Sequence, residues 1–394
     1  MSPPPIAADS IYLDHAAATP VRPEVAEAMA EAMAEAFANP SSPHRAGRLA
    51  KRLLEESRER ILAAAGSRSM AANRDRLVFT SGATEANRMA VLGLAGERAG
   101  TAATSARDHP GLRLAAGELS RQGWRLAEIP LTQRGCLETS AVGPLFAELS
   151  GPRLMTVTTV CGQTGLMEDD AAIGRLAEVD PGLLIHADAT QAAGWQLLRF
   201  SESPFTTLAL APHKFGGPRG IGGVIIRGTT AISPLIPGPQ ELGLRGGTEA
   251  VALAVGFARA FELAVLDQAV EAERVATLRS QFEADLLAAA TSAGLTAQVI
   301  GATAVRAPHV SALAILGVDR QMFVLAADLA GVCLSTGTAC SSGSGEPPAV
   351  LVALGVDPEA RNAVVRASFG RTTTPDDVAA AVERLTVVLS RMRR

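Results

Sequence analysis

The chain has 394 residues, of which 47% are hydrophobic, 19% charged and 4% aromatic, and its formal net charge is −4. This length exceeds the size at which one hydrophobic core stops growing, so two domains are expected. The acidic balance, with no basic run beyond the terminal RMRR, argues against a nucleic-acid surface. The sequence shows no basic leader before an apolar run and no apolar stretch of transmembrane length. We therefore expect a cytoplasmic protein with no membrane partner.

Cysteine usage separates one thiol from the others. Cys136, Cys161, Cys333 and Cys340 show no C-x-x-C spacing, which argues against a zinc site and a thioredoxin-like pair. We expect no metal and a reducing compartment. Cys340 lies in STGTACSSGSGEP, a stretch of small residues, whereas a packing cysteine usually has large apolar neighbours.

The N-terminal part predicts an extended segment, an amphipathic helix that begins with proline, and a second helix, at residues 11–14, 23–38 and 45–65. The apolar face of the first helix is predicted from residues four apart: Val25, Met29, Met33 and Phe37.

Short β-rich runs then alternate with helical segments, at residues 76–80, 101–104, 125–130, 153–160, 183–188, 206–211 and 220–227. Strands separated by crossover helices predict an α/β fold with a largely parallel, mixed sheet. Ligands of such sheets gather at the carboxyl ends of the strands. We expect this large cofactor-binding domain to span residues 20–260.

From about residue 249 the pattern changes to a long helical stretch that reaches residue 290. Strands at 309–316 and 364–369 follow, with a final helix from about residue 375. This pattern predicts a smaller α+β domain, built from residues 1–19 and 261–394, that carries the Cys340 segment.

Two strand ends carry residues suited to chemistry. LLIHADATQ places His186 and Asp188 at the end of a buried strand, where a carboxylate needs a cationic partner or caps the next helix. LALAPHKFGG presents His213 and Lys214 beside glycines. A lysine that loses its proton readily can form an imine, although a solvated surface lysine is commoner.

FTSGATEAN predicts a strand, a tight turn and a helix start, where Gly82, Ala83 and Thr84 could hold a phosphate. Helix capping by Ser81 or Thr84 explains the same pattern. Together, the segments indicate a ligand with a phosphate, a carbonyl and a protonated ring nitrogen, which is pyridoxal 5'-phosphate. His109, in RDHPG, could cover such a ring or move protons, or could be an exposed histidine at a helix start.

Over nearly its whole length the chain resembles the class V aminotransferase-like pyridoxal phosphate enzymes, and among them the cysteine desulfurases of the iron–sulfur cluster type. The motifs that carry the resemblance are YLDHAAATPVRPEV, NPSSPHRAGR, FTSGATEAN, HADATQAAG, PHKFGGPRGIGG, QELGLRGGTE, STGTACSSG and VRASFGRTTT. The resemblance implies a fold-type I enzyme that forms a homodimer.

The resemblance also implies roles in holding the cofactor. Lys214 would bind it covalently, Asp188 would pair with the pyridine nitrogen, Gln191 would donate to the ring hydroxyl, and His109 would stack on the ring. The phosphate ligands would be Thr84, His213 and, from the neighbouring subunit, Thr248.

For the substrate, Arg366 matches the arginine that clamps the carboxylate of L-cysteine. The thiol of Cys340 would attack the substrate sulfur, become a persulfide and pass that sulfur to an acceptor protein of unknown identity. The function implied is that of a cysteine desulfurase. Cys161, beside the expected pocket, is a second thiol of interest.

Three positions depart from the family pattern. Gly162 stands where a polar asparagine is usual, Ala211 replaces a phosphate-binding serine, and RDHPG replaces a Glu-His segment. Two alternatives therefore stay open. One is a lyase acting on cystine or selenocysteine, or a transaminase, neither of which would need Cys340. The other is a sulfur-relay scaffold with little turnover.

Overall fold

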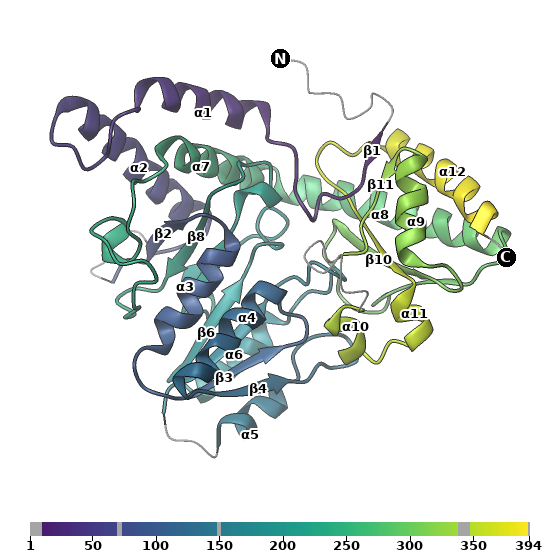
Figure 1. Ribbon diagram of the computed structural model, residues 1–394, viewed down its shortest axis with the longest axis horizontal. Coiled ribbons are helices and arrows are strands. Elements are labelled where there is room, and N and C mark those ends of the chain that lie inside the picture. The colour runs from purple at the N-terminus through teal and green to yellow at the C-terminus, as the bar shows by residue number, and fades with distance from the viewer. Residues whose placement is uncertain (1–9, 69–72, 148–150, 338–346, 393–394) are drawn as a thin grey trace.

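The computed structural model describes residues 10–68, 73–147, 151–337 and 347–392. Figure 1 shows a large sheet with its helices, coloured purple to teal, beside a smaller region coloured green to yellow. None of the helices within the described ranges is long and apolar enough to cross a membrane.

The large region is built on a seven-stranded sheet with the order β2-β8-β7-β6-β5-β3-β4. Its strands are β2 (Arg76–Thr80), β3 (Thr101–Ser105), β4 (Arg125–Ile129), β5 (Arg153–Thr158), β6 (Leu183–Asp188), β7 (Thr207–Leu210) and β8 (Gly222–Ile226). Neighbouring strands pair in parallel except where β8 lies antiparallel between β2 and β7. The predicted α/β class with a largely parallel, mixed sheet is confirmed.

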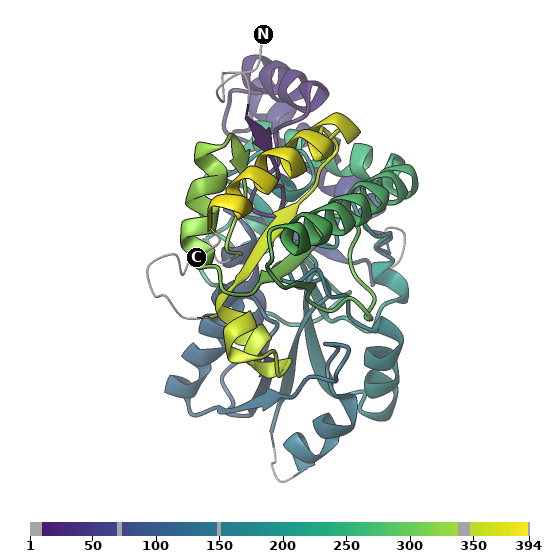
Figure 2. The same ribbon diagram turned by 90° about the vertical axis from the view of Figure 1, so that its right-hand side faces the viewer.

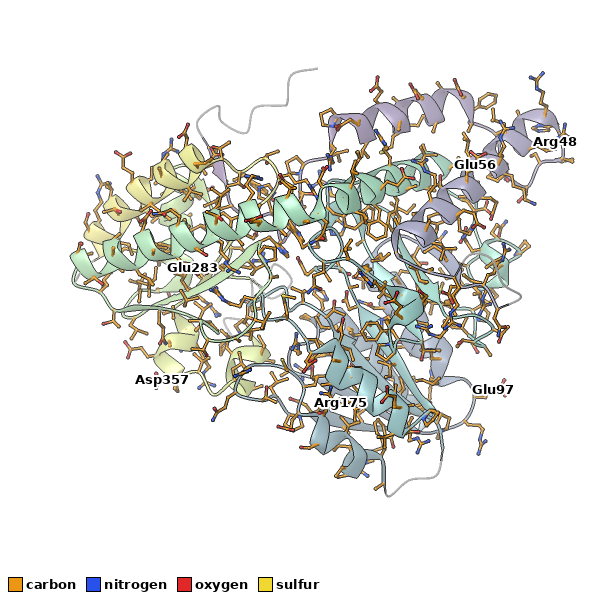
Figure 3. The ribbon with its side chains drawn as sticks, turned by 180° about the vertical axis from the view of Figure 1, so that it is seen from behind. Arg48, Glu56, Glu97, Arg175, Glu283 and Asp357 are labelled. Atoms are coloured by element: carbon orange, nitrogen blue, oxygen red, sulfur yellow. The ribbon has the colours of Figure 1, made fainter. Side chains whose placement is uncertain are left out.

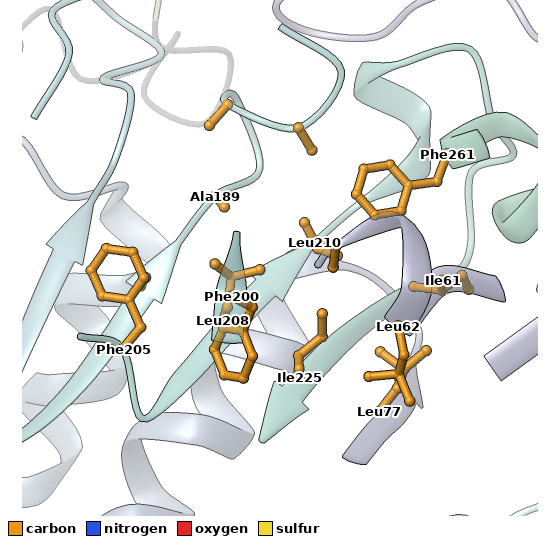
Figure 4. Packing of buried hydrophobic residues seen from close by; sticks show 14 of the residues in the cluster. Ile61, Leu62, Leu77, Ala189, Phe200, Phe205, Leu208, Leu210, Ile225 and Phe261 are labelled. Carbon is orange, nitrogen blue, oxygen red and sulfur yellow. The ribbon is translucent and has the colours of Figure 1, made fainter. Parts of the chain in front are cut away.

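Helices cover both faces of this sheet, because successive side chains along a strand point to opposite faces. Leu208 and Leu210 of β7 belong to one core, which Figure 4 shows with Phe261 nearby, whereas Ala209 packs in a cluster on the other face. The helices of the two faces are α2 (Arg45–Ala64), α6 (Asp170–Val179) and α7 (Val251–Leu266), opposite α3 (Ala83–Ala95) and α4 (Pro110–Leu119).

Helix α1 (Pro23–Glu35) packs against α7, but its predicted apolar face is only partly buried. Val25 is fully buried, whereas Met33 is 66% exposed. Phe37 lies two residues beyond the end of the helix and is 78% exposed. The far part of this face therefore has no cover within the described chain.

The smaller region, which faces the viewer in Figure 2, has helices beside a sheet of order β12-β10-β9. It has its own hydrophobic core. Its elements are α8 (Gln268–Ser292), β9 (Ala297–Val299), β10 (Val310–Ile315), α9 (Arg320–Leu329), β12 (Val364–Ser368) and α12 (Pro375–Met392). The N-terminal β1 (Ile11–Tyr12) joins this region by pairing in parallel with β11 (Val332–Cys333). The short helices are α5 (Val142–Ala147), α10 (Ala349–Ala353) and α11 (Pro358–Asn362).

The long helical stretch predicted from residue 249 is in fact two helices, α7 and α8, with Asp267 between them. The Asp267 carboxylate accepts hydrogen bonds from Arg22 and Arg371, at 2.9 and 3.3 Å. Helical periodicity could not show this break, because the apolar pattern continues through it.

Charge is distributed as expected for a folded chain. These charged residues, labelled in Figure 3, are exposed: Arg48, Glu56, Glu97, Arg175 and Asp357. Glu283 of α8 is buried instead, and both of its carboxylate oxygens accept hydrogen bonds from Arg306.

Candidate active site

Three of the predicted site segments end at the carboxyl edge of the seven-stranded sheet. Asp188 ends β6, and Lys214 lies in the 3-10 turn Pro212–Lys214 that follows the neighbouring strand β7. Because β2 and β7 both lie antiparallel to β8, β2 ends at this same edge and is followed by Gly82. The topology thus brings the three predicted segments together.

Lys214 contacts the N-terminal segment that crosses this edge. Its Nζ donates to the carbonyls of Ala16 and Ala17, at 2.6 and 2.9 Å. Gln191 Nε2 donates to the same Ala16 carbonyl at 2.8 Å. The lysine amine and the Gln191 amide therefore converge on one backbone group, although they come from different strand ends.

Asp188 is buried, with both carboxylate oxygens engaged. Asn87 Nδ2 donates to Oδ2 at 2.8 Å, and the backbone N–H of Thr190 donates to Oδ1 at 3.0 Å. Two donors suit a charged acceptor. Sequence reasoning did not single out Asn87, although its place one turn after Ala83 on α3 offered a signal.

His109 is the N-cap of α4, and its Nδ1 accepts a hydrogen bond from the backbone N–H of Gly111 at 3.1 Å. Its outer face is exposed, and partial burial of the ring lowers its pKa, with Asp188 raising it and Lys214 lowering it. With Nδ1 as the acceptor, the neutral ring carries its proton on Nε2.

The turn before His109 is fixed by a buried carboxylate. Asp108 accepts hydrogen bonds from the hydroxyls of Thr156 and Thr158, at 2.6 and 2.7 Å, and from the backbone N–H of Ser105 at 3.0 Å. Its burial raises its pKa. The departure RDHPG therefore holds His109 through an aspartate anchored to β5.

The start of α3 is open to an anion. No described side chain caps Gly82, and a Cβ placed there would meet no atom within 4 Å. The capping by Ser81 or Thr84 that the sequence left open is not observed; instead Glu85 accepts a hydrogen bond from the backbone N–H of Ser81. An uncapped helix N-terminus with free N–H groups is suited to phosphate.

His213 and Thr248, the other two predicted phosphate ligands, differ in how far they are buried. Burial, followed by the nearby charges of Lys214 and Arg219, lowers the pKa of His213 to about 4, so the ring is neutral at pH 7. Thr248 is exposed on the loop before α7. The structure describes no hydrogen bond between Thr248 and the other predicted site residues of the chain.

Arg366 of β12 joins several segments and is only 5% exposed. Its Nη2 binds Asp14 Oδ1 at 2.7 Å, and its Nη1 donates to the carbonyls of Gly162 and Gly337, at 2.9 and 3.1 Å. Asp14 was missed from the sequence. Gly162 also lies against Gln191, because an added Cβ would be 3.1 Å from its Nε2.

Gly337 ends the described part of the segment that leads to Cys340, which itself lies outside the described residues. Gln163 Nε2 donates to the carbonyl of Thr336 at 3.1 Å. Gly337 has φ +92°, and a Cβ there would lie 2.0 Å from that same Nε2, so only glycine fits. Cys161 is 2% exposed and packs in a hydrophobic cluster.

Comparison with known proteins shows the family of the chain. The family described as Aminotransferase class-V matches residues 11–381. Cysteine desulfurase IscS of Dictyoglomus turgidum is 33% identical over 387 residues, covering 97% of this chain and 95% of that protein. The IscS-like cysteine desulfurase of Mycobacterium tuberculosis is 32% identical over 392 residues, covering 97% of each.

Solved structures show the same fold. A NifS-like protein superimposes with a TM-score of 0.86 at 25% identity, covering 97% of this chain and all of the other. SspA in complex with cysteine gives a TM-score of 0.76 at 26% identity, covering 93% and 100%. The resemblance stated from the motifs is confirmed. The chain therefore belongs to the aminotransferase class-V family, in the group of the cysteine desulfurases.

Proposed function

We propose that the protein is a pyridoxal 5'-phosphate-dependent cysteine desulfurase that converts L-cysteine and the thiol of Cys340 into L-alanine and a Cys340 persulfide. One observation carries the proposal. The Lys214 amine, the Asp188 carboxylate and the uncapped start of α3 meet at one edge of the sheet. Those three groups match the carbonyl, ring nitrogen and phosphate of that cofactor.

The residues at this edge would hold the cofactor in distinct ways. Lys214 would bind it covalently, Asp188 would pair with the ring nitrogen, Gln191 would donate to the ring hydroxyl, and His109 would cover the ring. The residues that would bind its phosphate are Gly82, Ala83, Thr84, His213 and Thr248 of the partner subunit. When bound, the cofactor withdraws electrons from the substrate and so eases cleavage of its bonds.

The chain supplies the remaining steps. Arg366 binds the substrate carboxylate through its planar guanidinium. Because Nδ1 of His109 accepts a hydrogen bond from Gly111, the neutral ring carries its proton on Nε2, and His109 acts as a hydrogen-bond donor through that nitrogen. The thiolate of Cys340 attacks the substrate sulfur and becomes a persulfide. The outer sulfur of this persulfide is later transferred to an acceptor protein. SspA, which is similar in fold, has been solved with cysteine bound, which supports L-cysteine as substrate.

The same proposal includes a cytoplasmic homodimer with two domains per subunit, residues 20–260 and residues 1–19 with 261–394. The exposed apolar side chains of Met33 and Phe37 support a subunit contact at the α1 end. The exposure of Thr248 leaves it free to reach a partner's phosphate site.

Mass spectrometry after brief exposure to cysteine without reductant tests the function. We expect one added sulfur atom on the peptide that contains Cys340, and L-alanine in solution. Cys340→Ser should abolish both and retain the cofactor, whereas Cys136→Ser, at a half-buried cysteine, should change neither. Extra sulfur on Cys161, or alanine made at the wild-type rate by Cys340→Ser, would refute the mechanism. Pyruvate in place of alanine would favour the lyase.

A further inference from the structure

A series of buried polar side chains lies beneath Asp188. Asn87 belongs to α3, His186 and Asp188 to β6, and Thr207 to β7, and all four are between 0% and 6% exposed. Thr207 Oγ1 lies 2.9 Å from His186 Nδ1, and His186 Nε2 lies 2.9 Å from Asn87 Oδ1. Asn87 Nδ2 donates to Asp188 at 2.8 Å. Three hydrogen bonds thus connect Thr207 with Asp188.

The direction of every bond follows from the charge of Asp188. An ionised carboxylate can only accept, so Asn87 must turn its Nδ2 toward Asp188 and its Oδ1 toward His186. That oxygen also only accepts, so the proton of a neutral His186 must sit on Nε2. Nδ1 is then an acceptor, and the hydroxyl of Thr207 must donate to it.

These hydrogen-bond directions require the His186 ring to be neutral. Burial lowers its pKa to about 4, against the opposing attraction of Asp188, so the ring is neutral at pH 7. A charged ring would carry protons on both nitrogens and could not accept from Thr207. If all three hydrogen bonds ran the other way, Asp188 would have to be protonated. A protonated Asp188 could not pair as an anion with the protonated pyridine nitrogen of the cofactor.

We propose that Thr207, His186 and Asn87 form a one-way hydrogen-bond relay that holds Asp188 as an oriented anion, with His186 as the Nε2–H tautomer. The three are positioning residues, since they act on the cofactor through Asp188. Hydrogen bonds in series polarise one another, so the hydroxyl of Thr207 strengthens the donor that reaches Asp188. This inference rests on the proposed function, which pairs Asp188 with the cofactor.

Two threonines offer a matched test. Thr207 and Thr101 are both almost fully buried and both begin strands of the same sheet. The Thr101 hydroxyl has no hydrogen-bond partner among the described residues. Thr207→Val and Thr101→Val each replace a buried hydroxyl by a methyl group of the same shape, and only the first breaks the relay. Thr207→Ser keeps the hydroxyl and serves as the rescue variant.

The first measurement is the tautomer of His186 in the full-length apoprotein, labelled with ¹⁵N-histidine and assigned by comparison with His186→Gln. We expect the proton on Nε2 in wild type, Thr207→Ser and Thr101→Val, and a changed ¹⁵N pattern in Thr207→Val. A proton on Nδ1 in the wild-type protein would overturn the relay. This measurement needs no cofactor, so it decides the relay even if the proposed function fails.

The second measurement is the rate at which bound pyridoxal phosphate is lost to a competing amine. Loss of one buried hydrogen bond should make Thr207→Val release the cofactor about threefold to tenfold faster, with Thr207→Ser and Thr101→Val near wild type. Equal rates for the two valine variants, or a serine variant that behaves like Thr207→Val, would contradict the relay. A wild-type protein that holds no cofactor would instead refute the proposed function.

Discussion

The two sides of the site differ in how their polar groups are satisfied. Beneath Asp188, each side chain of the Thr207–His186–Asn87 series has its partner within the chain. On the side of Arg366, several buried atoms have no hydrogen-bond partner among the described residues: Gln163 Oε1, His309 Nδ1 and Arg366 Nε. Unpaired buried groups are costly, so these atoms would gain from a partner in a ligand or another segment, as would Thr190 Oγ1 on the first side.

The difference separates the two halves of the proposed reaction. In the proposed function, the closed side would hold the cofactor, although Ala211 stands there in place of a phosphate-binding serine. The open side contains Gly162, a departure from the family pattern, and the described stem of the Cys340 segment, which ends at Gly337. Substitutions on the first side should therefore change cofactor binding and catalysis together, and those on the second should change substrate binding.

The largest effect is expected for Asp188→Asn, on the closed side. An amide has one acceptor oxygen, so its NH₂ group would face a donor, either Asn87 Nδ2 or the backbone N–H of Thr190. The ring nitrogen would also lose its anionic partner. We expect the rate of alanine formation to fall by about two orders of magnitude, where each tenfold corresponds to roughly 1.4 kcal/mol of activation free energy. Steady-state rates measure this, and Asp180→Asn, in a surface pair with Arg153, should stay near wild type.

Arg366→Lys should affect the open side alone. A lysine cannot bind Asp14 and two carbonyls while also forming a planar fork for a carboxylate. We expect KM for L-cysteine to rise about tenfold or more with a smaller change in kcat, and cofactor retention to stay the same. Faster cofactor loss in this variant would contradict the separation of the two sides.

The proposed phosphate site at the start of α3 can be tested by titrating His213. Its pKa is about 4 because burial and the positive charges of Lys214 and Arg219 oppose protonation. A bound phosphate anion favours the charged ring, so inorganic phosphate should raise this pKa by about one unit or more. NMR titration of the apoprotein gives the measurement. His309, whose pKa is about 3 through burial and nearby positive charges, should not move, and equal shifts in both would argue against a local effect.

Ala211→Ser should have the smallest effect. Ala211 is fully buried between β7 and the turn that carries Lys214, where a hydroxyl would add one donor near the proposed phosphate site. We expect cofactor loss to slow by a few-fold, in line with about 1 kcal/mol for a hydrogen bond. An unchanged rate of exchange with a competing amine would show that another group already supplies this contact. Ala209→Ser, buried in β7 away from the turn, is the matched control.

Much of the site could be predicted because strand ends are local features. Alternating β-rich runs and helical segments predicted the sheet, and the carboxyl-edge rule placed Asp188, Lys214 and Gly82 together. The register of the strands and the antiparallel course of β8 were not readable, because they depend on pairing between distant segments. The break at Asp267 was missed for the same reason, since its partners Arg22 and Arg371 are far away in sequence.

The sequence by itself determined the family, the α/β class and the residues that can carry chemistry, because these follow from residue type, spacing and hydrophobic period. Only the tertiary structure decided which groups satisfy one another. Asn87 and Thr207 lie 120 residues apart in sequence and are connected through one histidine ring, and Asp14 meets Arg366 across 352 residues. Such hydrogen bonds depend on distance and angle in space, which no local pattern in the sequence encodes.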